Sequence, residues 1–164
     1  MPERNAATAM SIRTIDLFCG AGGSSTGARK AGAQIVAGFD IWAPAVKVYR
    51  ENFPEASRVF DEDIRKLSPA EVRREIGDIN LILASPECTN HSVAKGKAER
   101  DEESRMTAFQ VLRFAEEFLP QWIVVENVTE MASWARHEEL TNKLSSLGYQ
   151  IQPATFNAQQ FSVA

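Results

Sequence analysis

Two side chains with catalytic potential follow short apolar runs in this chain. Cys88 comes shortly after the run at residues 79–84, and Glu126 comes directly after the run at residues 122–125. A cysteine can act as a nucleophile in its thiolate form, and a glutamate can donate or accept a proton. Together they suit nucleophilic addition to an electron-poor ring, in which the acid neutralises the charge that addition creates. A plain structural interpretation stays open, with Cys88 an inert thiol and Glu126-Asn127 the cap of a following helix.

A glycine-rich turn supplies a place for a ligand. Residues 15–18 form a mainly apolar run that leads into Gly20, Gly22 and Gly23, and a helix-compatible stretch follows. Glycines remove the Cβ atoms that would keep a ligand away from the backbone, and the free N–H groups at a helix start attract polar or anionic ligand atoms. The pattern therefore predicts a strand, a turn and a helix that bind a nucleotide, although a turn that merely packs closely also fits it.

An acidic residue narrows the choice of nucleotide. Asp40 ends the apolar run at residues 35–39 and lies 20 positions beyond Gly20. At this spacing a carboxylate at the end of the next strand can reach ribose hydroxyls, so we expect an adenosine-bearing ligand. The glycine spacing departs from the dinucleotide fingerprint, which makes a nicotinamide-dependent oxidoreductase the least favoured interpretation. A P-loop is excluded because no Gly-Lys-Ser/Thr follows at the required spacing.

Apolar runs alternate with helix-compatible segments along the chain. We expect strands at residues 15–18, 35–39, 59–60, 79–84, 122–125 and 149–156. Helices are expected at residues 43–53, from Ser68 with that serine as N-cap, from Ser104 to Phe118, and at residues 134–147. This alternation predicts a doubly wound α/β fold, with a mostly parallel sheet and helices on both faces. In such sheets, ligands bind outside the carboxyl ends of the strands.

Several special residues fall at those expected carboxyl ends, namely Gly20, Asp40, Asp63, Cys88 and Glu126. Asp63 belongs to an acidic stretch at residues 61–63, which fits either a solvated strand end or a carboxylate that holds an adenine amino group. Because so many of these residues share one edge of the expected sheet, we expect a single site there.

Composition limits the class of protein. The chain has 164 residues, of which 44% are hydrophobic, so we expect one domain at residues 13–164 after a polar tail at residues 1–12. The sequence shows no signal peptide and no run of roughly 20 apolar residues, which predicts a soluble, cytoplasmic protein without a membrane partner. Both cysteines are expected to be free thiols, and the two cysteines and two histidines lack zinc spacing, which predicts no metal site.

The charge balance bears on nucleic-acid binding. The net charge is −4, so affinity for a nucleic acid requires a local basic patch or another chain segment. The polar stretch at residues 89–105 carries such a patch, made of Lys95, Lys97, Arg100 and Arg105. Phosphate contacts from these side chains would position a nucleic acid without reading its sequence.

These features together resemble the cytosine-5 DNA methyltransferases, which use S-adenosylmethionine. The segment DLFCGAGG at residues 16–23 resembles the first cofactor motif of that family, Asp40 its ribose-binding acid, and Asp63-Ile64 its adenine-contacting pair. The order and spacing match over nearly all of residues 12–164. The resemblance implies S-adenosylmethionine as cofactor and S-adenosylhomocysteine as product. The cofactor-binding residues that it implies are Asp16, Phe18, Gly20, Gly22, Gly23, Asp40, Asp63, Ile64 and Pro86.

The candidate catalytic residues resemble further motifs of the same family. Cys88 resembles the nucleophile of its Pro-Cys motif and Ser92 the serine four residues on. Glu126-Asn127-Val128 resembles its Glu-Asn-Val motif. The resemblance implies that Cys88 adds to C6 of a cytosine flipped out of double-stranded DNA, that Glu126 protonates or hydrogen-bonds N3, and that Asn127 helps to hold the site. Position 87 departs from the motif, because Glu87 stands where the family usually has proline.

The C-terminal end also departs from the family pattern. Residues 156–161 resemble the approach to a Gln-x-Arg-x-Arg motif, but the sequence stops at Ala164 before any such arginines. The resemblance therefore implies a domain incomplete at this end, completed by a C-terminal segment or a second subunit that carries the target-recognition region. It also suggests a restriction-modification setting. Two alternatives stay open, a non-catalytic cofactor-binding or assembly module and an RNA cytosine-5 methyltransferase.

Overall fold

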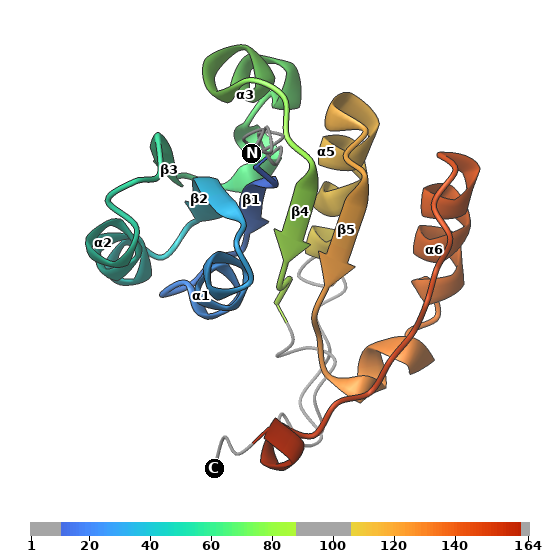
Figure 1. The fold of residues 1–164 in the computed structure, drawn as a ribbon. Coiled ribbons are helices and arrows are strands. Elements are labelled where there is room, and N and C mark those ends of the chain that lie inside the picture. The colour runs from blue at the N-terminus through green and yellow to red at the C-terminus, as the bar shows by residue number, and fades with distance from the viewer. Residues whose placement is uncertain (1–10, 88–105, 162–164) are drawn as a thin grey trace, which may run out of the picture.

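A parallel five-stranded sheet forms the centre of the protein (Figure 1). The computed structural model describes residues 11–87 and 106–161. Within them the strands lie in the order β3-β2-β1-β4-β5, and each neighbouring pair is parallel. The predicted doubly wound α/β fold is therefore confirmed. The strands are β1 (Arg13–Leu17), β2 (Gln34–Asp40), β3 (Arg58–Asp61), β4 (Leu81–Ala84) and β5 (Trp122–Val125).

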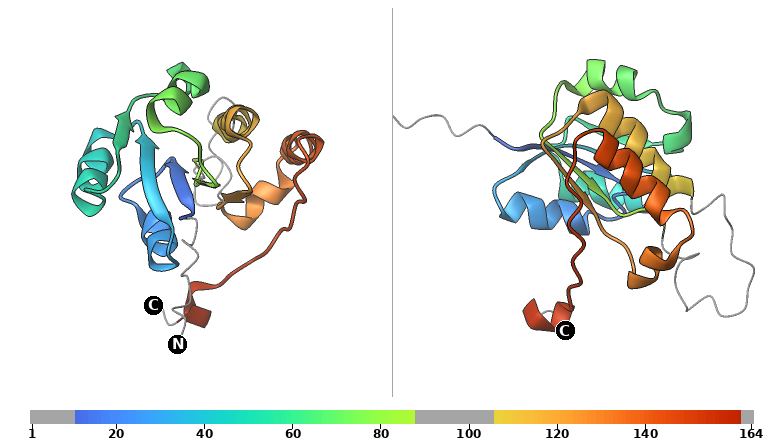
Figure 2. Two further views of the ribbon diagram at one scale, coloured as in Figure 1. Left: turned by 45° about the horizontal axis from the view of Figure 1, so that its top comes forward. Right: turned by 90° about the vertical axis from the view of Figure 1, so that its right-hand side faces the viewer.

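Helices cover both faces of this sheet (Figures 1 and 2). One face carries α1 (Gly23–Lys30) and α2 (Ala43–Asn52). The other face carries α3 (Pro69–Ile76) and α5 (Gln110–Phe118), and α6 (His137–Ser146) packs beside α5. Short 3₁₀ helices are η1 (Ile64–Lys66), η3 (Met106–Phe109), η4 (Thr129–Ser133) and η5 (Ala158–Phe161).

Of two predicted helix starts, that of α3 is confirmed and that of α6 is wrong by three residues. α3 begins as predicted, because the Ser68 hydroxyl accepts a hydrogen bond from the Glu71 N–H at 3.4 Å and Pro69 is the first helical residue. α6 begins at His137 rather than at residue 134, because η4 occupies residues 129–133 and the Trp134 side chain is buried beside α5. The helix predicted from Ser104 is described only from Met106, and Ser104 itself lies outside the described residues.

The main core lies between the sheet and the helices α3 and α5. There Phe39 stacks on Phe60 with ring centroids 4.5 Å apart, and it meets the edge of Phe114 at 5.3 Å. On the opposite face the buried rings of Tyr49 and Phe53 pack beneath the glycine-rich turn. Aromatic rings on both faces therefore fix the strand ends at which the site is expected.

β2 contains one extra residue relative to β1. Thr14 pairs with Ile35 and Ile15 pairs with Ala37, so Val36 is passed over in the register. Because side chains alternate between the faces of a sheet, this shift lets Ile35 pack on the α2 face while Ala37 packs on the α5 face.

The strand predicted at residues 149–156 is wrong. The described chain from Gln150 to Phe161 is exposed and forms no strand, and Figure 2 shows it leading from α6 away from the sheet to η5. Tyr149 still anchors its start, because the phenol hydroxyl donates to the Pro120 carbonyl at 2.8 Å. A strand requires a neighbour for its backbone hydrogen bonds, and no described strand lies beside this segment.

β5 is the least buried strand of the sheet. The exposed fractions of Trp122, Val124 and Val125 are 69%, 52% and 37%, although parallel strands are normally covered on both faces. Among the described residues β5 pairs with β4 alone, so its outer edge is also uncovered. None of the described helices is both long enough and apolar enough to cross a membrane.

We expect this exposed face of β5 to make the chain self-associate. The double variant Trp122→Ser, Val124→Thr should associate less in sedimentation velocity runs over a concentration series. Its free energy of unfolding in urea should change by no more than about 0.5 kcal/mol, because both side chains are exposed. Val48→Thr changes an exposed valine on α2 and serves as the control that leaves association unchanged. Association that persists in the double variant would contradict the expectation.

Candidate active site

The glycine-rich turn is the best-defined part of the site. It follows β1 and opens α1, and it holds three residues in the left-handed region, with φ of 61° at Phe18, 51° at Gly20 and 95° at Gly22. The Cys19 N–H donates to the Phe39 carbonyl at 3.0 Å, which ties the turn to the end of β2. A non-glycine residue with positive φ is strained, and such strain clusters at ligand-binding sites.

The three predicted glycines have different surroundings. A Cβ on Gly22 would lie 2.2 Å from the Phe53 ring, so this glycine is needed for packing. The Cβ positions of Gly20 and Gly23 have no heavy atom within 4 Å and face open space. One side of the turn is therefore closed by the core and the other is open for a ligand to approach the backbone.

Asp40 lies directly against this turn. Its Oδ2 accepts the Gly20 N–H at 2.8 Å, and its Oδ1 accepts the Trp42 N–H at 2.8 Å. A carboxylate offers about four acceptor positions, so two stay free for other donors such as ligand hydroxyls. The structure thus brings the predicted ribose-binding acid and the glycine-rich turn into contact.

Asp16 lies beneath the turn and is fully buried. Its Oδ2 accepts a hydrogen bond from the Ser25 hydroxyl at 2.6 Å, and the Ser25 oxygen is 2.7 Å from the Tyr49 hydroxyl. Its Oδ1 is buried with no hydrogen-bond partner among the described residues. Burial raises the pKa of the Asp16 carboxyl to about 6, against the lowering effect of the Ser25 hydrogen bonds, and nearby Asp40 adds to the rise.

The single cysteine of the turn is a free, buried thiol. Burial, with Asp16 and Asp40 nearby, raises the pKa of the Cys19 thiol far above its usual range. Cys19 is therefore an inert packing residue rather than a nucleophile.

The two residues of the predicted adenine-contacting pair differ in burial, because the Asp63 side chain is 14% exposed and Ile64 lies in the core. The Asp63 carboxylate accepts the Arg65 backbone N–H at 3.0 Å and forms an ion pair with the Arg65 guanidinium at 2.8 Å. These hydrogen bonds lower the pKa of Asp63 below its usual range. Ile64 is buried in the main core, so its side chain fixes η1 against the sheet.

The side chain of Asn127, a predicted site residue, joins the chain after β5 to the chain after β4. Asn127 Nδ2 donates to the Pro86 carbonyl at 2.9 Å, and Asn127 Oδ1 accepts the Val128 N–H at 2.9 Å. The neighbouring Glu126 is exposed, and its N–H donates to the Ala84 carbonyl at 2.9 Å. The Nδ2 bond of Asn127 thus holds the chain after β5 beside the end of β4, while its Oδ1 bond fixes the local backbone.

Hydroxyl groups add contacts that sequence reasoning missed. The Ser24 and Ser85 oxygens are 3.4 Å apart, which links the first turn of α1 to the residue after β4. Sequence reasoning also missed Ser25 as the partner of Asp16. The hydroxyl residues that follow the glycines were the only signal in the sequence for the Ser24 and Ser25 contacts.

Several predicted site residues lie outside the described residues. They include the candidate nucleophile, the serine four positions on, and the basic patch. Their roles therefore stay predictions, for Cys88, Ser92, Lys95, Lys97, Arg100 and Arg105.

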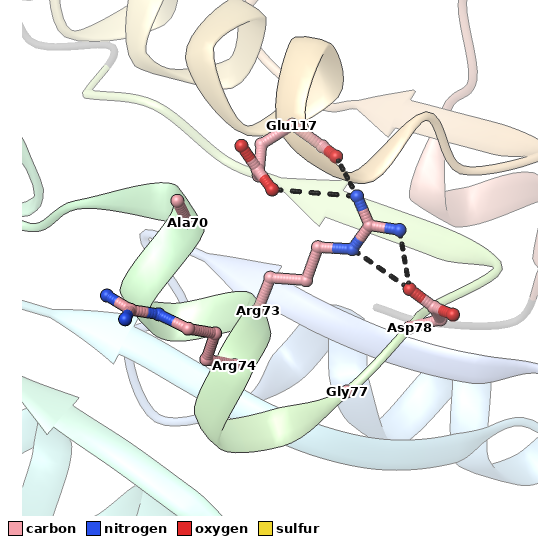
Figure 3. Close-up of a pocket in the computed structure, with 6 residues that line it drawn as sticks. All are labelled: Ala70, Arg73, Arg74, Gly77, Asp78 and Glu117. Carbon is pink, nitrogen blue, oxygen red and sulfur yellow. Dashed lines mark hydrogen bonds and ion pairs between the residues drawn. The ribbon is translucent and has the colours of Figure 1, made fainter.

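A pocket of the described chain lies away from the glycine-rich turn. It measures about 480 Å³ and lies beside the residues that precede β4 (Figure 3). Because β1 and β4 are parallel and the glycine-rich turn follows β1, this pocket lies at the opposite end of the sheet from the turn. Arg73 crosses it from α3, pairs with Asp78 at 2.8 Å and donates to the Glu117 carbonyl of α5 at 2.8 Å. These bonds occupy the Arg73 guanidinium, which joins α3 to α5 across the pocket. The described residues contain no cluster that could hold a metal ion.

Comparisons with known proteins identify the family of the chain. The chain matches the C-5 cytosine-specific DNA methylase family over residues 12–164. It is 30% identical over 159 residues to the type II methyltransferase M.AgeI of Thalassovita gelatinovora, a match that covers 93% of this chain and 37% of that protein. It is 34% identical over 122 residues to the type II methyltransferase M.HgiGI of Herpetosiphon aurantiacus, which covers 71% of this chain and 90% of that protein.

A solved structure shows the same likeness. The crystal structure of a DNA modification methyltransferase encoded within an E. coli prophage superposes with a TM-score of 0.69 at 26% identity, over 84% of this chain and 37% of that chain. The chain spans between 37% and 49% of the length of M.AgeI and four other type II methyltransferases that it matches. Because the family match covers nearly the whole sequence, this chain belongs to the C-5 cytosine-specific DNA methylase family.

Proposed function

We propose that this chain is the cofactor-binding and catalytic part of an enzyme that transfers a methyl group from S-adenosylmethionine to C5 of cytosine in DNA. The observation that carries the proposal is the meeting of four strand ends at one edge of the sheet. There the open glycine-rich turn contacts Asp40, and Asn127 ties the end of β5 to Pro86 after β4. In doubly wound sheets this edge is where ligands bind.

The described residues fit the proposed cofactor. Open space at Gly20 and Gly23 leaves the backbone accessible, and Asp40 keeps acceptor positions free for ribose hydroxyls. The bound cofactor would supply an electrophilic methyl group on a sulfonium centre. The proposed cofactor-binding residues are Asp16, Phe18, Gly20, Gly22, Gly23, Asp40, Asp63, Ile64 and Pro86.

The proposed chemistry uses residues that follow β4 and β5. The Cys88 thiolate adds to C6 of the cytosine, while Glu126 donates a proton or a hydrogen bond to N3. C5 thereby becomes nucleophilic and accepts the methyl group. Loss of the C5 proton and departure of the Cys88 sulfur then restore the aromatic ring as 5-methylcytosine. Asn127 positions this site by holding the carbonyl of Pro86, two residues before Cys88.

DNA binding and completion of the fold belong to the same proposal. The target cytosine must leave the helix to reach a pocket at the sheet edge, and the basic residues of the 89–105 stretch would contact phosphates, with Ser92 near the nucleophile. The uncovered face and edge of β5 provide a surface for a completing C-terminal segment or second subunit. We propose residues 13–164 as the catalytic domain and residues 1–12 as a tail.

Transfer of a labelled methyl group to mixed-sequence duplex DNA tests the function. The wild-type chain, alone and mixed with the C-terminal half of a relative such as M.AgeI, is incubated with labelled cofactor, and Cys88→Ser is the control. We expect label in DNA that disappears in the variant, and a covalent adduct with DNA containing 5-fluorocytosine. Cofactor binding without transfer or adduct in either mixture would instead indicate a non-catalytic module, and label in RNA but not in DNA would indicate an RNA substrate.

A further inference from the structure

Arg113 on α5 binds the backbone of the segment that carries the predicted adenine-contacting pair. Its Nη2 donates to the Leu67 carbonyl at 2.8 Å, and its Nη1 donates to the carbonyls of Ile64 and Arg65 at 3.4 Å each. These acceptors lie 46 to 49 positions earlier in the sequence. One guanidinium therefore spans η1 and the residue that follows it.

This guanidinium acts as a helix cap supplied by another helix. Its Nη1 also donates to the side-chain oxygen of Gln110 on α5 at 2.7 Å. Every acceptor that Arg113 contacts in the described chain is thus a neutral oxygen, and three of them are backbone carbonyls. The last carbonyls of a helix lack partners within the helix, and an arginine side chain can satisfy them. Arg113 therefore fixes the C-terminal end of η1.

The other end of η1 carries Asp63. Its carboxylate accepts three N–H groups of Arg65, namely the backbone N–H at 3.0 Å, Nε at 3.0 Å and Nη2 at 2.8 Å. A carboxylate offers about four acceptor positions, so about one is left for the N–H of a ligand. β3 runs parallel to β2 with Asp61 beside Asp40, so Asp63 follows β3 at the sheet edge that carries the glycine-rich turn.

We propose that Arg113 is a positioning residue, which fixes η1 so that Asp63 can accept an N–H of the adenine amino group of the cofactor. The inference rests on the proposed function. η1 has only three residues, too few for a helix to hold its own geometry. Ile64 anchors it in the core, but the carbonyls on either side lose their shared donor when Arg113 is removed. The segment can then rotate about Ile64, and a hydrogen bond weakens steeply below an angle of about 120°.

Two ligands that differ only on one edge of the base test this role. S-adenosylhomocysteine has an amino group there, whereas S-inosylhomocysteine has a carbonyl oxygen, which a carboxylate repels. We expect the full wild-type chain to bind the adenine ligand at least about tenfold more tightly in calorimetry, because a hydrogen bond to a charged group is lost with the other ligand. Arg113→Met should lower this ratio to less than about threefold. Arg113→Lys keeps the charge and part of the donor capacity, so its ratio should be intermediate.

Arg73→Met is the matched control. Arg73 also joins α3 to α5 through a backbone carbonyl, that of Glu117, but it lies at the opposite end of the sheet. Its loss should lower the free energy of unfolding and leave the ratio unchanged. A merely structural role of Arg113 would have the same result. A ratio unchanged in both Arg113 variants would therefore overturn the inference, and Arg113→Lys alone decides if Arg113→Met does not fold.

Asp63→Ala tests whether Arg113 acts through Asp63. This variant should lose the preference for the adenine ligand, and addition of Arg113→Met should then change the ratio no further. A further change in the double variant would overturn the inference, because Arg113 would then act on the base by another route. Loss of the preference in Asp63→Ala but not in the Arg113 variants would overturn this inference alone. Failure of the wild type to bind either ligand would overturn the proposed cofactor function as well.

Discussion

Replacing Gly22 by alanine is expected to lower the free energy of unfolding by about 3 kcal/mol or more. The added Cβ would lie 2.2 Å from the Phe53 ring and 3.1 Å from the Tyr49 ring, both of which are buried. The φ of 95° at this position adds backbone strain that alanine does not share with glycine. Neither ring can move away cheaply, because both are buried in one cluster with Cys19 of the turn and Ile35 of β2.

The measurement is urea unfolding followed by far-UV circular dichroism, with Gly27→Ala as the matched control. Gly27 lies inside α1 with nothing within 4 Å of its Cβ position, so alanine there should stabilise the helix by about 0.5 to 1 kcal/mol. The same chemical change is thus expected to have opposite signs at two positions five residues apart. A Gly22→Ala variant as stable as the wild type would show that the turn is not packed against α2 as described.

The second large effect concerns Asp16 and pH. Its carboxyl has a pKa of about 6 in the folded chain against a reference value of 3.8, so between these values the folded state holds a proton that the unfolded state has lost. Stability from this group is therefore present below pH 3.8 and is lost as pH rises through about 6. At 1.36 kcal/mol for each pKa unit, the loss is about 3 kcal/mol.

Comparison of wild type with Asp16→Asn isolates this effect from other titrating groups. The free energy of unfolding of the variant, minus that of the wild type, should rise by about 2.5 kcal/mol between pH 4 and pH 8. Asparagine keeps an oxygen that can accept from Ser25, and its own charge does not change with pH. A difference that stays constant over this range would mean that Asp16 has no raised pKa in the folded chain.

The sequence predicted the fold well where the signal is local. The runs that became β4 and β5 are apolar over their whole length, and those that became β1 and β2 are mainly apolar, as is typical of parallel strands. The contact between Gly20 and Asp40 also follows from sequence spacing, because the ends of adjacent parallel strands must meet at one edge.

Other features depend on distant partners and could not be predicted in this way. Residues 149–156 have a strand-like composition, but a strand forms only beside another strand, and the described chain supplies none. The burial of Asp16 depends on Ser25, which lies 9 positions further along the chain, and on Tyr49, which lies 24 positions beyond Ser25. The hydrogen bond between Asn127 and Pro86 spans 41 positions, and the sequence around neither residue predicts it.

The extra residue in β2 affects how the strand can tolerate changes in length. Because Val36 has no counterpart in β1, its deletion would restore a regular ladder without moving the pairs that follow, Ile15 with Ala37 and Leu17 with Phe39. Asp40 comes directly after Phe39 and would stay opposite Gly20. Gain or loss of one residue elsewhere in β2 would instead turn every later side chain to the other face, including the Asp40 carboxylate. Deletion of Val36 would thus leave the carboxylate at the turn, although it would remove a side chain that is buried in the main core.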